Sequence, residues 1–198
     1  MEVGVVSMYC DQNNYEHYIV DALSSIGYKS HIIYYDNPEN VYNSIVNSNI
    51  KKWIFSGSAH TVIYPNSPIV PMKIFNIPDK QFLLICYSME SVFHQLKVGE
   101  IKKRYENKKE KFRLKIDMKV VKELHLEYLF TGLKNTLNLY RNHHWYFTSI
   151  FGKLDNIIEF AKYRGESMMA VYKNAILVQY HPERTKEGII LIKNWLTN

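Results

Sequence analysis

The segment Gln81-Phe82-Leu83-Leu84-Ile85-Cys86-Tyr87-Ser88-Met89-Glu90 changes from one structural pattern to another at its cysteine. Its first half contains the continuous apolar run Phe82–Ile85, which is typical of a strand buried on both faces. After the cysteine, apolar residues recur at helical spacing, at Met89, Val92, Phe93 and Leu96. The segment therefore predicts a buried strand that passes directly into a helix, with Cys86 in the turn between them.

A side chain on such a turn projects from the carboxyl edge of its sheet, beside the N-terminus of the helix. We expect this position to lower the pKa of the Cys86 thiol and to stabilise an oxyanion. Free cysteines are also common core residues, so a catalytic interpretation needs a base from elsewhere in the chain.

The chain before Cys86 alternates between strand and helix patterns. The expected strands are Val3–Val6, His31–Tyr35 and Trp53–Phe55, and the expected helices are Tyr15–Ile26, Val41–Val46 and a short one at Val70–Phe75. Asp11–Asn14 is expected to cap the first helix, and Gly27 to end it. This order predicts an α/β fold with a mostly parallel central sheet flanked by helices, in a flavodoxin-like three-layer arrangement. Ligands bind at the carboxyl ends of such strands, where both Ser56-Gly57-Ser58 and Cys86 fall.

The second half adds a small antiparallel section to this fold. Ile101–Tyr105 and Phe112–Ile116 alternate as two strands across a charged turn, whereas Val120–Leu126 fits either strand or helix. A further strand is expected at Leu137–Leu139, and a hairpin joins Met168–Tyr172 to Ala175–Tyr180 across Lys173-Asn174. A final helix is expected to turn five residues inward: Ile189, Ile190, Ile192, Trp195 and Leu196.

Length and composition are those of one globular domain, residues 1–198. With 46% hydrophobic residues the chain can bury a substantial core. Its two cysteines make no disulfide framework, its N-terminus lacks a secretion signal, and no segment approaches the roughly 18 apolar residues of a membrane span. We therefore expect a cytoplasmic protein without a membrane segment.

The net charge of +6 is concentrated in the segment Lys97–Lys122. This segment could offer an electrostatic platform for a nucleotide, an RNA or an acidic partner, or it could be a solvated excursion. We favour the solvated interpretation, and nucleic acid is not an expected partner.

His181-Pro182-Glu183 ends the last predicted strand, as Cys86 ends an earlier one. The proline stiffens the backbone between an imidazole and a carboxylate, and positions i and i+2 of extended chain face the same side. Glu183 could then orient His181, which would take the proton of the Cys86 thiol. The alternative is a surface turn that happens to contain both residues.

Together, these motifs resemble the class I, triad-type glutamine amidotransferases over nearly the whole chain. The resemblance is closest to the stand-alone glutaminase subunit or domain of GMP synthetase. Cys86–Glu90 corresponds to that family's Cys-Tyr-Gly-Met-Gln, and His181–Gly188 reads His-Pro-Glu-x-Thr-x-x-Gly.

The resemblance implies a triad of Cys86 as nucleophile, His181 as general base and acid, and Glu183 as the group that orients the histidine. It also implies an oxyanion hole formed by the backbone N–H groups of Ser58 and Tyr87. Four residues are expected to contact the substrate: Gly57, Glu90, Asn142 and His143. The substrate would be glutamine or another γ-glutamyl compound, and the released ammonia would pass to a separate synthetase subunit. No cofactor is expected, and His143-His144 has no other ligand residue at close spacing, so no metal site is expected either.

Four positions depart from the family pattern. Leu84 and Ser88 replace the glycines of Gly-x-Cys-x-Gly, so Leu84 requires repacking and Ser88 is a candidate for narrowing the pocket. Ser58 replaces the second glycine of the oxyanion loop. Glu90 replaces a glutamine that holds the amino-acid end of the substrate, and a carboxylate there would repel an α-carboxylate. These differences leave two alternatives open: a γ-glutamyl peptide hydrolase, or a binding or regulatory subunit that has lost turnover.

Overall fold

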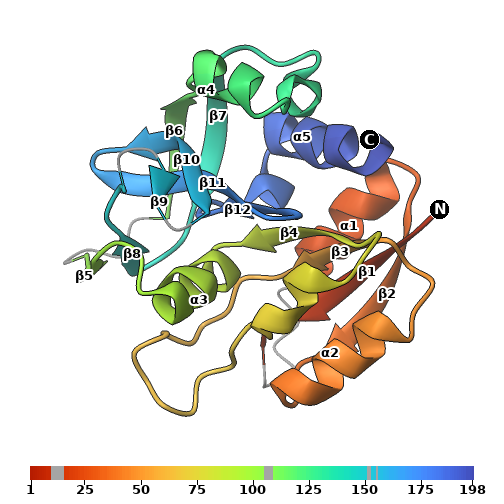
Figure 1. Ribbon diagram of the computed structural model, residues 1–198. Helices are drawn as coiled ribbons and strands as arrows, with labels where there is room; N and C mark the ends of the chain where they lie inside the picture. The colour runs from red at the N-terminus through yellow and green to blue at the C-terminus, as the bar shows by residue number, and fades with distance from the viewer. Residues whose placement is uncertain (10–15, 105–108, 151–152, 155) are drawn as a thin grey trace.

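The computed structural model describes residues 1–9, 16–104, 109–150, 153–154 and 156–198. Within these residues, one eight-stranded sheet has the order β2-β1-β3-β4-β12-β11-β10-β9 (Figure 1). Its first five strands are parallel: β2 (Lys29–Tyr34), β1 (Glu2–Ser7), β3 (Lys52–Phe55), β4 (Gln81–Ile85) and β12 (Ala175–Val178). The other three continue it in antiparallel fashion: β11 (Glu166–Tyr172), β10 (Ile157–Tyr163) and β9 (Lys153–Leu154). The expected mostly parallel central sheet is confirmed.

Helices cover both faces of the parallel strands because alternate strand residues point to opposite sides. On β4, Leu83 and Ile85 join the cluster that includes α1 (His17–Ser25) and α5 (Lys186–Thr197). Phe82 and Leu84 join the opposite cluster, with α2 (Pro38–Val46) and α3 (Tyr87–Leu96). Figure 1 shows these helices on the two sides of the sheet. The three-layer prediction is therefore correct, and Leu84 is accommodated within a packed core.

The antiparallel section pairs its strands differently from the prediction. The first two predicted strands do not pair with each other: β5 (Ile101–Lys103) pairs with β8 (Trp145–Phe147), and β6 (Glu110–Lys115) pairs with β7 (Thr136–Arg141). The reason is that the buried residues Phe112 and Leu114 of β6 need an apolar partner, which Leu137 and Leu139 of β7 supply.

Short helices connect these strands. The ambiguous segment Val120–Leu126 contains the end of helix α4 (Met118–Glu123). Three 3-10 helices follow loops: η1 (Met72–Asn76), where a short helix was expected, η2 (Glu127–Phe130) and η3 (Pro182–Arg184). Gly27 has a φ of 84° directly after α1, as expected of a residue that ends a helix, whereas the predicted cap Asp11–Asn14 lies outside the described residues.

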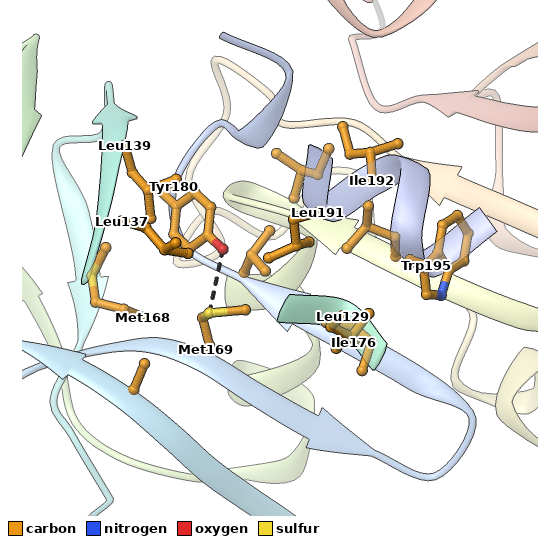
Figure 2. Close-up of a cluster of buried hydrophobic side chains, with 14 of the residues drawn as sticks. Leu129, Leu137, Leu139, Met168, Met169, Ile176, Tyr180, Leu191, Ile192 and Trp195 are labelled. Carbon is orange, nitrogen blue, oxygen red and sulfur yellow. Dashed lines mark hydrogen bonds between the residues drawn. The ribbon is translucent and has the colours of Figure 1, made fainter. Parts of the chain in front are cut away.

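The last helix, α5, packs its apolar stripe against β12 and η2. Figure 2 shows Leu191, Ile192 and Trp195 of α5 in one buried cluster with Ile176 and Leu129. The prediction for Ile190 was wrong: this residue is 37% exposed, and Leu191 is buried in its place. Positions 188, 191, 192, 195 and 196 form the true stripe because they follow the helical period of 3.6 residues.

None of the helices in the described part of the chain combines the length and the apolar character needed to cross a bilayer.

Gly188 lets α5 approach the His181–Glu183 turn. A Cβ atom built at this position would lie 2.1 Å from the backbone oxygen of Pro182. We predict that Gly188→Ala lowers the free energy of unfolding by about 1–3 kcal/mol, because the helix must move away from the turn. Ile190→Ala on the exposed face of the same helix is the control and should cost less than about 1 kcal/mol. Urea denaturation of both variants checks this, and equal losses would contradict a steric requirement at Gly188.

Candidate active site

The turn at Cys86 has the backbone geometry of a nucleophile elbow. Cys86 lies between β4 and α3 with φ 52° and ψ −109°, a conformation that L-residues rarely adopt. Its N–H donates a hydrogen bond to the Val178 carbonyl at 2.7 Å, and its carbonyl accepts one from the Glu90 N–H at 3.1 Å. Such conformations cost about 1–3 kcal/mol and persist where the surrounding structure enforces them. The sheet and the first helical turn therefore fix the position of the thiol.

His181 follows β12, which is the parallel neighbour of β4. Its Nδ1 lies 2.7 Å from Oε1 of Glu183, and its imidazole lies close enough to the Cys86 thiol for each group to shift the pKa of the other. His181 is largely buried and Glu183 is 9% exposed, so this turn is part of the interior wall and not a surface turn. The structure thus brings Cys86, His181 and Glu183 together in the order of a nucleophile, a base and a group that orients the base.

The pKa of the cysteine differs from the sequence expectation. Burial raises the pKa of the Cys86 thiol, and the opposing effects of His181 and of the Tyr87 backbone N–H do not reverse this. For His181, burial lowers the pKa, but Glu183 and Cys86 together raise it well above its usual value. The helix N-terminus alone therefore does not activate the thiol, and a proton acceptor beside it is required.

Gly57 lies close to both His181 and Cys86, with little room for a side chain. A Cβ atom at Gly57 would come within 3.1 Å of Cε1 of His181 and 3.5 Å of Cβ of Cys86. The neighbouring Ser58 is held by its hydroxyl, which donates to the Met8 carbonyl at 2.9 Å and accepts from the His60 N–H at 3.2 Å. The φ of Ser58 is not positive, so a serine fits this loop without backbone strain.

A cavity of about 520 Å³ opens over Cys86. Six other predicted site residues lie on its wall: Ser58, Tyr87, Glu90, Asn142, His143 and His181. Gly57 and Glu183 instead line a much smaller cavity behind His181. Sequence reasoning missed further wall residues that come from loops and from the antiparallel section: Tyr9, Ala59, His60, Thr61, Tyr64, Lys103, Lys109, His144 and Trp145.

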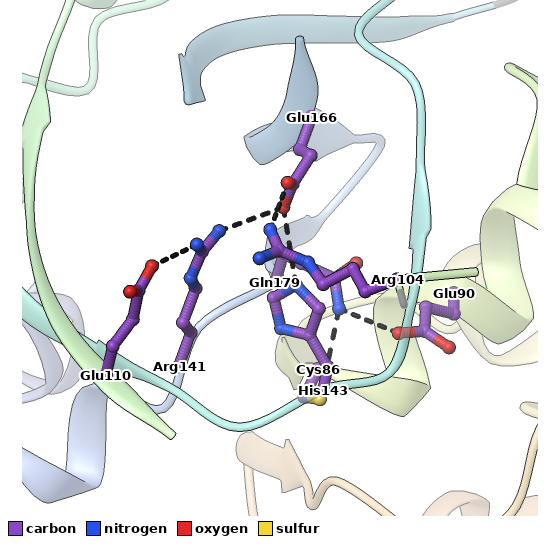
Figure 3. A network of polar contacts seen from close by, with 8 residues as sticks. All are labelled: Cys86, Glu90, Arg104, Glu110, Arg141, His143, Glu166 and Gln179. Atoms are coloured by element: carbon purple, nitrogen blue, oxygen red, sulfur yellow. Dashed lines mark hydrogen bonds and ion pairs between the residues drawn. The ribbon is translucent and has the colours of Figure 1, made fainter. Parts of the chain in front are cut away.

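Glu90 is a buried carboxyl group on the wall of this cavity. Its Oε1 accepts a hydrogen bond of 2.7 Å from Nε2 of Gln179, and the same nitrogen lies 3.9 Å from Sγ of Cys86 (Figure 3). Burial raises the pKa of Glu90 to about 8, so the group is mostly neutral at pH 7. A neutral carboxyl group has nearly the shape of glutamine and does not repel an α-carboxylate as an ionised one would.

Ser88 does not narrow the cavity. It is fully buried, it is absent from the cavity wall, and its hydroxyl donates to the Ser56 carbonyl at 2.6 Å. Ser88 therefore links α3 to the loop after β3 by a hydrogen bond.

A buried ionic network includes one residue of the cavity wall, His143. Glu166 of β11 pairs with Arg104, with Arg141 at 3.3 Å and with Nε2 of His143 at 3.4 Å, while Arg141 also pairs with Glu110 (Figure 3). Burial lowers the pKa of His143 to about 4, so its ring is neutral. The network ties three separate segments to the main sheet beside Asn142 and His143.

Local sequence patterns carry a weak signal for some of these residues. Gln179 is a polar residue that directly follows the apolar strand β12, which marks a buried polar position. Glu166, Arg104 and Arg141 carry no such signal, because their pairing joins segments that are far apart in the sequence. In the described part of the chain, no group of three or more His, Cys, Asp or Glu side chains is arranged to hold a metal ion.

Comparison with known proteins gives one family and several similar folds. The family model described as glutamine amidotransferase class-I matches residues 10–196. A candidate GMP synthase subunit from Thermoplasma acidophilum has a TM-score of 0.73 at 16% identity, over 100% of this chain and 92% of that one. PurLQS from Thermotoga maritima has a TM-score of 0.66 at 13% sequence identity, over 99% of this chain and 98% of that one. A glutamine amidotransferase from Thermotoga maritima has a TM-score of 0.56 at 14% sequence identity, over 98% of this chain and 80% of that one. A search of curated proteins finds no match. At these identities the structures show the fold alone.

The raised pKa of Glu90 predicts a pH-dependent effect on stability. The unfolded chain loses this proton near the ordinary pKa of 4.5, whereas the folded chain keeps it up to about pH 8, so folding loses stability as pH rises between these values. Relative to the wild type, Glu90→Gln should therefore gain up to about 1.4 kcal/mol in unfolding free energy per pH unit between about pH 5 and pH 8.

Urea titrations at several pH values measure this gain, and Glu100→Gln is the control because that side chain is 72% exposed. A difference between Glu90→Gln and the wild type that does not change with pH would contradict a neutral Glu90.

Proposed function

Because this chain belongs to the class I glutamine amidotransferase family, we propose that it is a glutaminase-type enzyme that releases ammonia from glutamine through a γ-glutamyl thioester. The observation that carries this proposal is the placement of Cys86 and His181 on the wall of one cavity, with the Glu183 carboxylate 2.7 Å from Nδ1 of His181. A protein that only binds a ligand has no need to keep a strained cysteine beside a paired histidine.

The mechanism follows from this geometry. His181 takes the Cys86 proton through Nε2, because Glu183 occupies Nδ1, and the thiolate attacks the γ-carbonyl carbon of the substrate. The carbon–nitrogen bond breaks as His181 returns the proton to the leaving amine, which departs as ammonia. Water then attacks the thioester with His181 as base, so that glutamate leaves and the thiol is restored.

Stabilisation of the oxyanion is assigned to two backbone N–H groups, those of Ser58 and Tyr87. Support comes from the position of Tyr87, the first residue of α3, whose N–H belongs to the helix N-terminus that directly follows Cys86. Ser58 belongs to the loop that Gly57 brings against His181. Donors fixed before the reaction stabilise a developing negative charge without the cost of reorganisation.

The ammonia is proposed to pass to a separate synthetase subunit of the GMP synthetase kind, in purine biosynthesis and in the cytoplasm. The fold likeness to PurLQS and to a candidate GMP synthase subunit supports this assignment. Affinity purification of the tagged chain from its own cells tests it, since recovery of the chain without any ammonia-using synthetase would count against a partner of this kind.

Substitutions in the triad should separate chemistry from folding. Cys86→Ala should release no glutamate from glutamine, and Glu183→Gln should lower kcat by roughly 10²–10⁴-fold because the histidine loses its orientation and the charge that stabilises its protonated form. The measurement is glutamate release by the purified chain, alone and with its partner.

Labelling with a glutamine-like diazo-ketone tests the nucleophile independently of turnover. The Cys10→Ser variant, which removes the other cysteine of the sequence, should still be labelled at Cys86, and Cys86→Ser should not. An unlabelled Cys86 in a folded protein without glutaminase activity would favour a binding or regulatory role.

A further inference from the structure

The cavity over Cys86 extends well beyond the triad. Its volume of about 520 Å³ lies within the range of roughly 300–1,000 Å³ that takes a drug-sized ligand. Glutamine is much smaller than such a ligand, so it would fill only the part next to Cys86. The remaining wall is supplied by the antiparallel section, through Lys103, Lys109, His144 and Trp145.

Lys103 and Lys109 give this part of the wall two ammonium groups. Among the described residues, no carboxylate oxygen lies within 4 Å of either group, whereas the neighbouring Lys102 forms an ion pair with Glu100 at 3.1 Å. Nζ of Lys103 lies 5.6 Å from the centre of the Trp145 ring, and the two residues are directly paired between β5 and β8. Arg104, the next residue, is anchored to Glu166. The Lys103 backbone is thus fixed, and its charge is available to a ligand.

No negative charge on the described wall opposes these two lysines at neutral pH. Glu90 is the one carboxyl group among the described wall residues, and its burial, which raises its pKa to about 8, keeps it mostly neutral. His143 is neutral as well, because burial lowers its pKa to about 4. The field inside the cavity therefore favours an anion.

We infer that the outer part of this cavity binds an anionic group carried by the amine of a γ-glutamyl amide, so that acidic γ-glutamyl compounds are substrates in addition to glutamine. This inference rests on the proposed function, because the reacting centre is the same. Cys86 attacks the γ-carbonyl carbon, the amide carbon–nitrogen bond breaks, His181 protonates the amine, and water resolves the thioester. One water is consumed, and the products are glutamate and the free acidic amine.

The test compares γ-glutamylglutamate, whose amine is acidic, with γ-glutamylethylamide, whose amine is neutral. The ratio of their kcat/KM values is measured for the wild type, Lys103→Gln, Lys109→Gln and the double variant, at low and high salt. Lys102→Gln is the matched control: it removes the same charge from the adjacent residue of β5, which lies outside the cavity wall.

We expect the wild type to prefer γ-glutamylglutamate. Each cavity lysine substitution should lower the ratio by roughly two- to fivefold, and the double variant should lower it about tenfold, as for partly exposed ion pairs. High salt should reduce the wild-type preference, and Lys102→Gln should leave the ratio unchanged.

Three results would overturn the inference. Equal cleavage of the two compounds with no effect of Lys103→Gln and Lys109→Gln would exclude the anion subsite while leaving the proposed glutaminase intact. If Lys102→Gln lowers the ratio of kcat/KM values as much as the cavity substitutions do, the preference would come from the overall positive field of the protein and not from an anionic group bound in the cavity. No cleavage of any γ-glutamyl compound, together with an unreactive Cys86, would refute the proposed function and this inference with it.

Discussion

The hydrogen bond from the Cys86 N–H to the Val178 carbonyl is the contact on which the arrangement of this site depends. It joins the ends of β4 and β12, two parallel strands in register from Phe82 and Ala175 onward. Because both strands end at the same level, Cys86, directly after β4, and His181, the third residue after β12, lie at the same edge of the sheet. Cys86 is thereby placed beside His181 although the two belong to distant segments.

A second constraint acts beside the cavity wall that His143 supplies. Two segments of the antiparallel section bring charged or polar groups to Glu166, Arg104 from one and Arg141 and His143 from the other, so a buried carboxylate is balanced by two guanidinium groups. Removing one member of such a group leaves an uncompensated buried charge, which typically costs about 3–5 kcal/mol. Arg104 and Arg141 are therefore required together to balance Glu166, while the neutral His143 adds a contact to the same carboxylate.

The layered fold, and the placement of Cys86, His181 and Glu183 near one another, could be predicted because their signals are local. The apolar run Phe82–Ile85 and the helical spacing after Tyr87 locate the turn, and His181-Pro182-Glu183 brings a base and a carboxylate in one motif. The pairing of β5 with β8 and of β6 with β7 could not be predicted. Phe112 and Leu114 of β6 pack against a strand that buries them, and that strand is not the nearest one in the sequence. The protonation of Cys86 and Glu90 was also beyond local reasoning, because desolvation depends on the whole surrounding structure.

The site is thus divided between two parts of the chain with different tolerance to change. The parallel strands carry the groups that are proposed to react, whose positions are set by backbone pairing, while the short strands β5 and β8 supply side chains at the outer wall. Substitutions at positions such as Lys103 and Trp145 can alter which molecules enter without disturbing the strand ends that carry Cys86 and His181. Selection can therefore act on substrate recognition and on bond cleavage separately. A protein with this fold can thus change its substrate while the same reaction is retained.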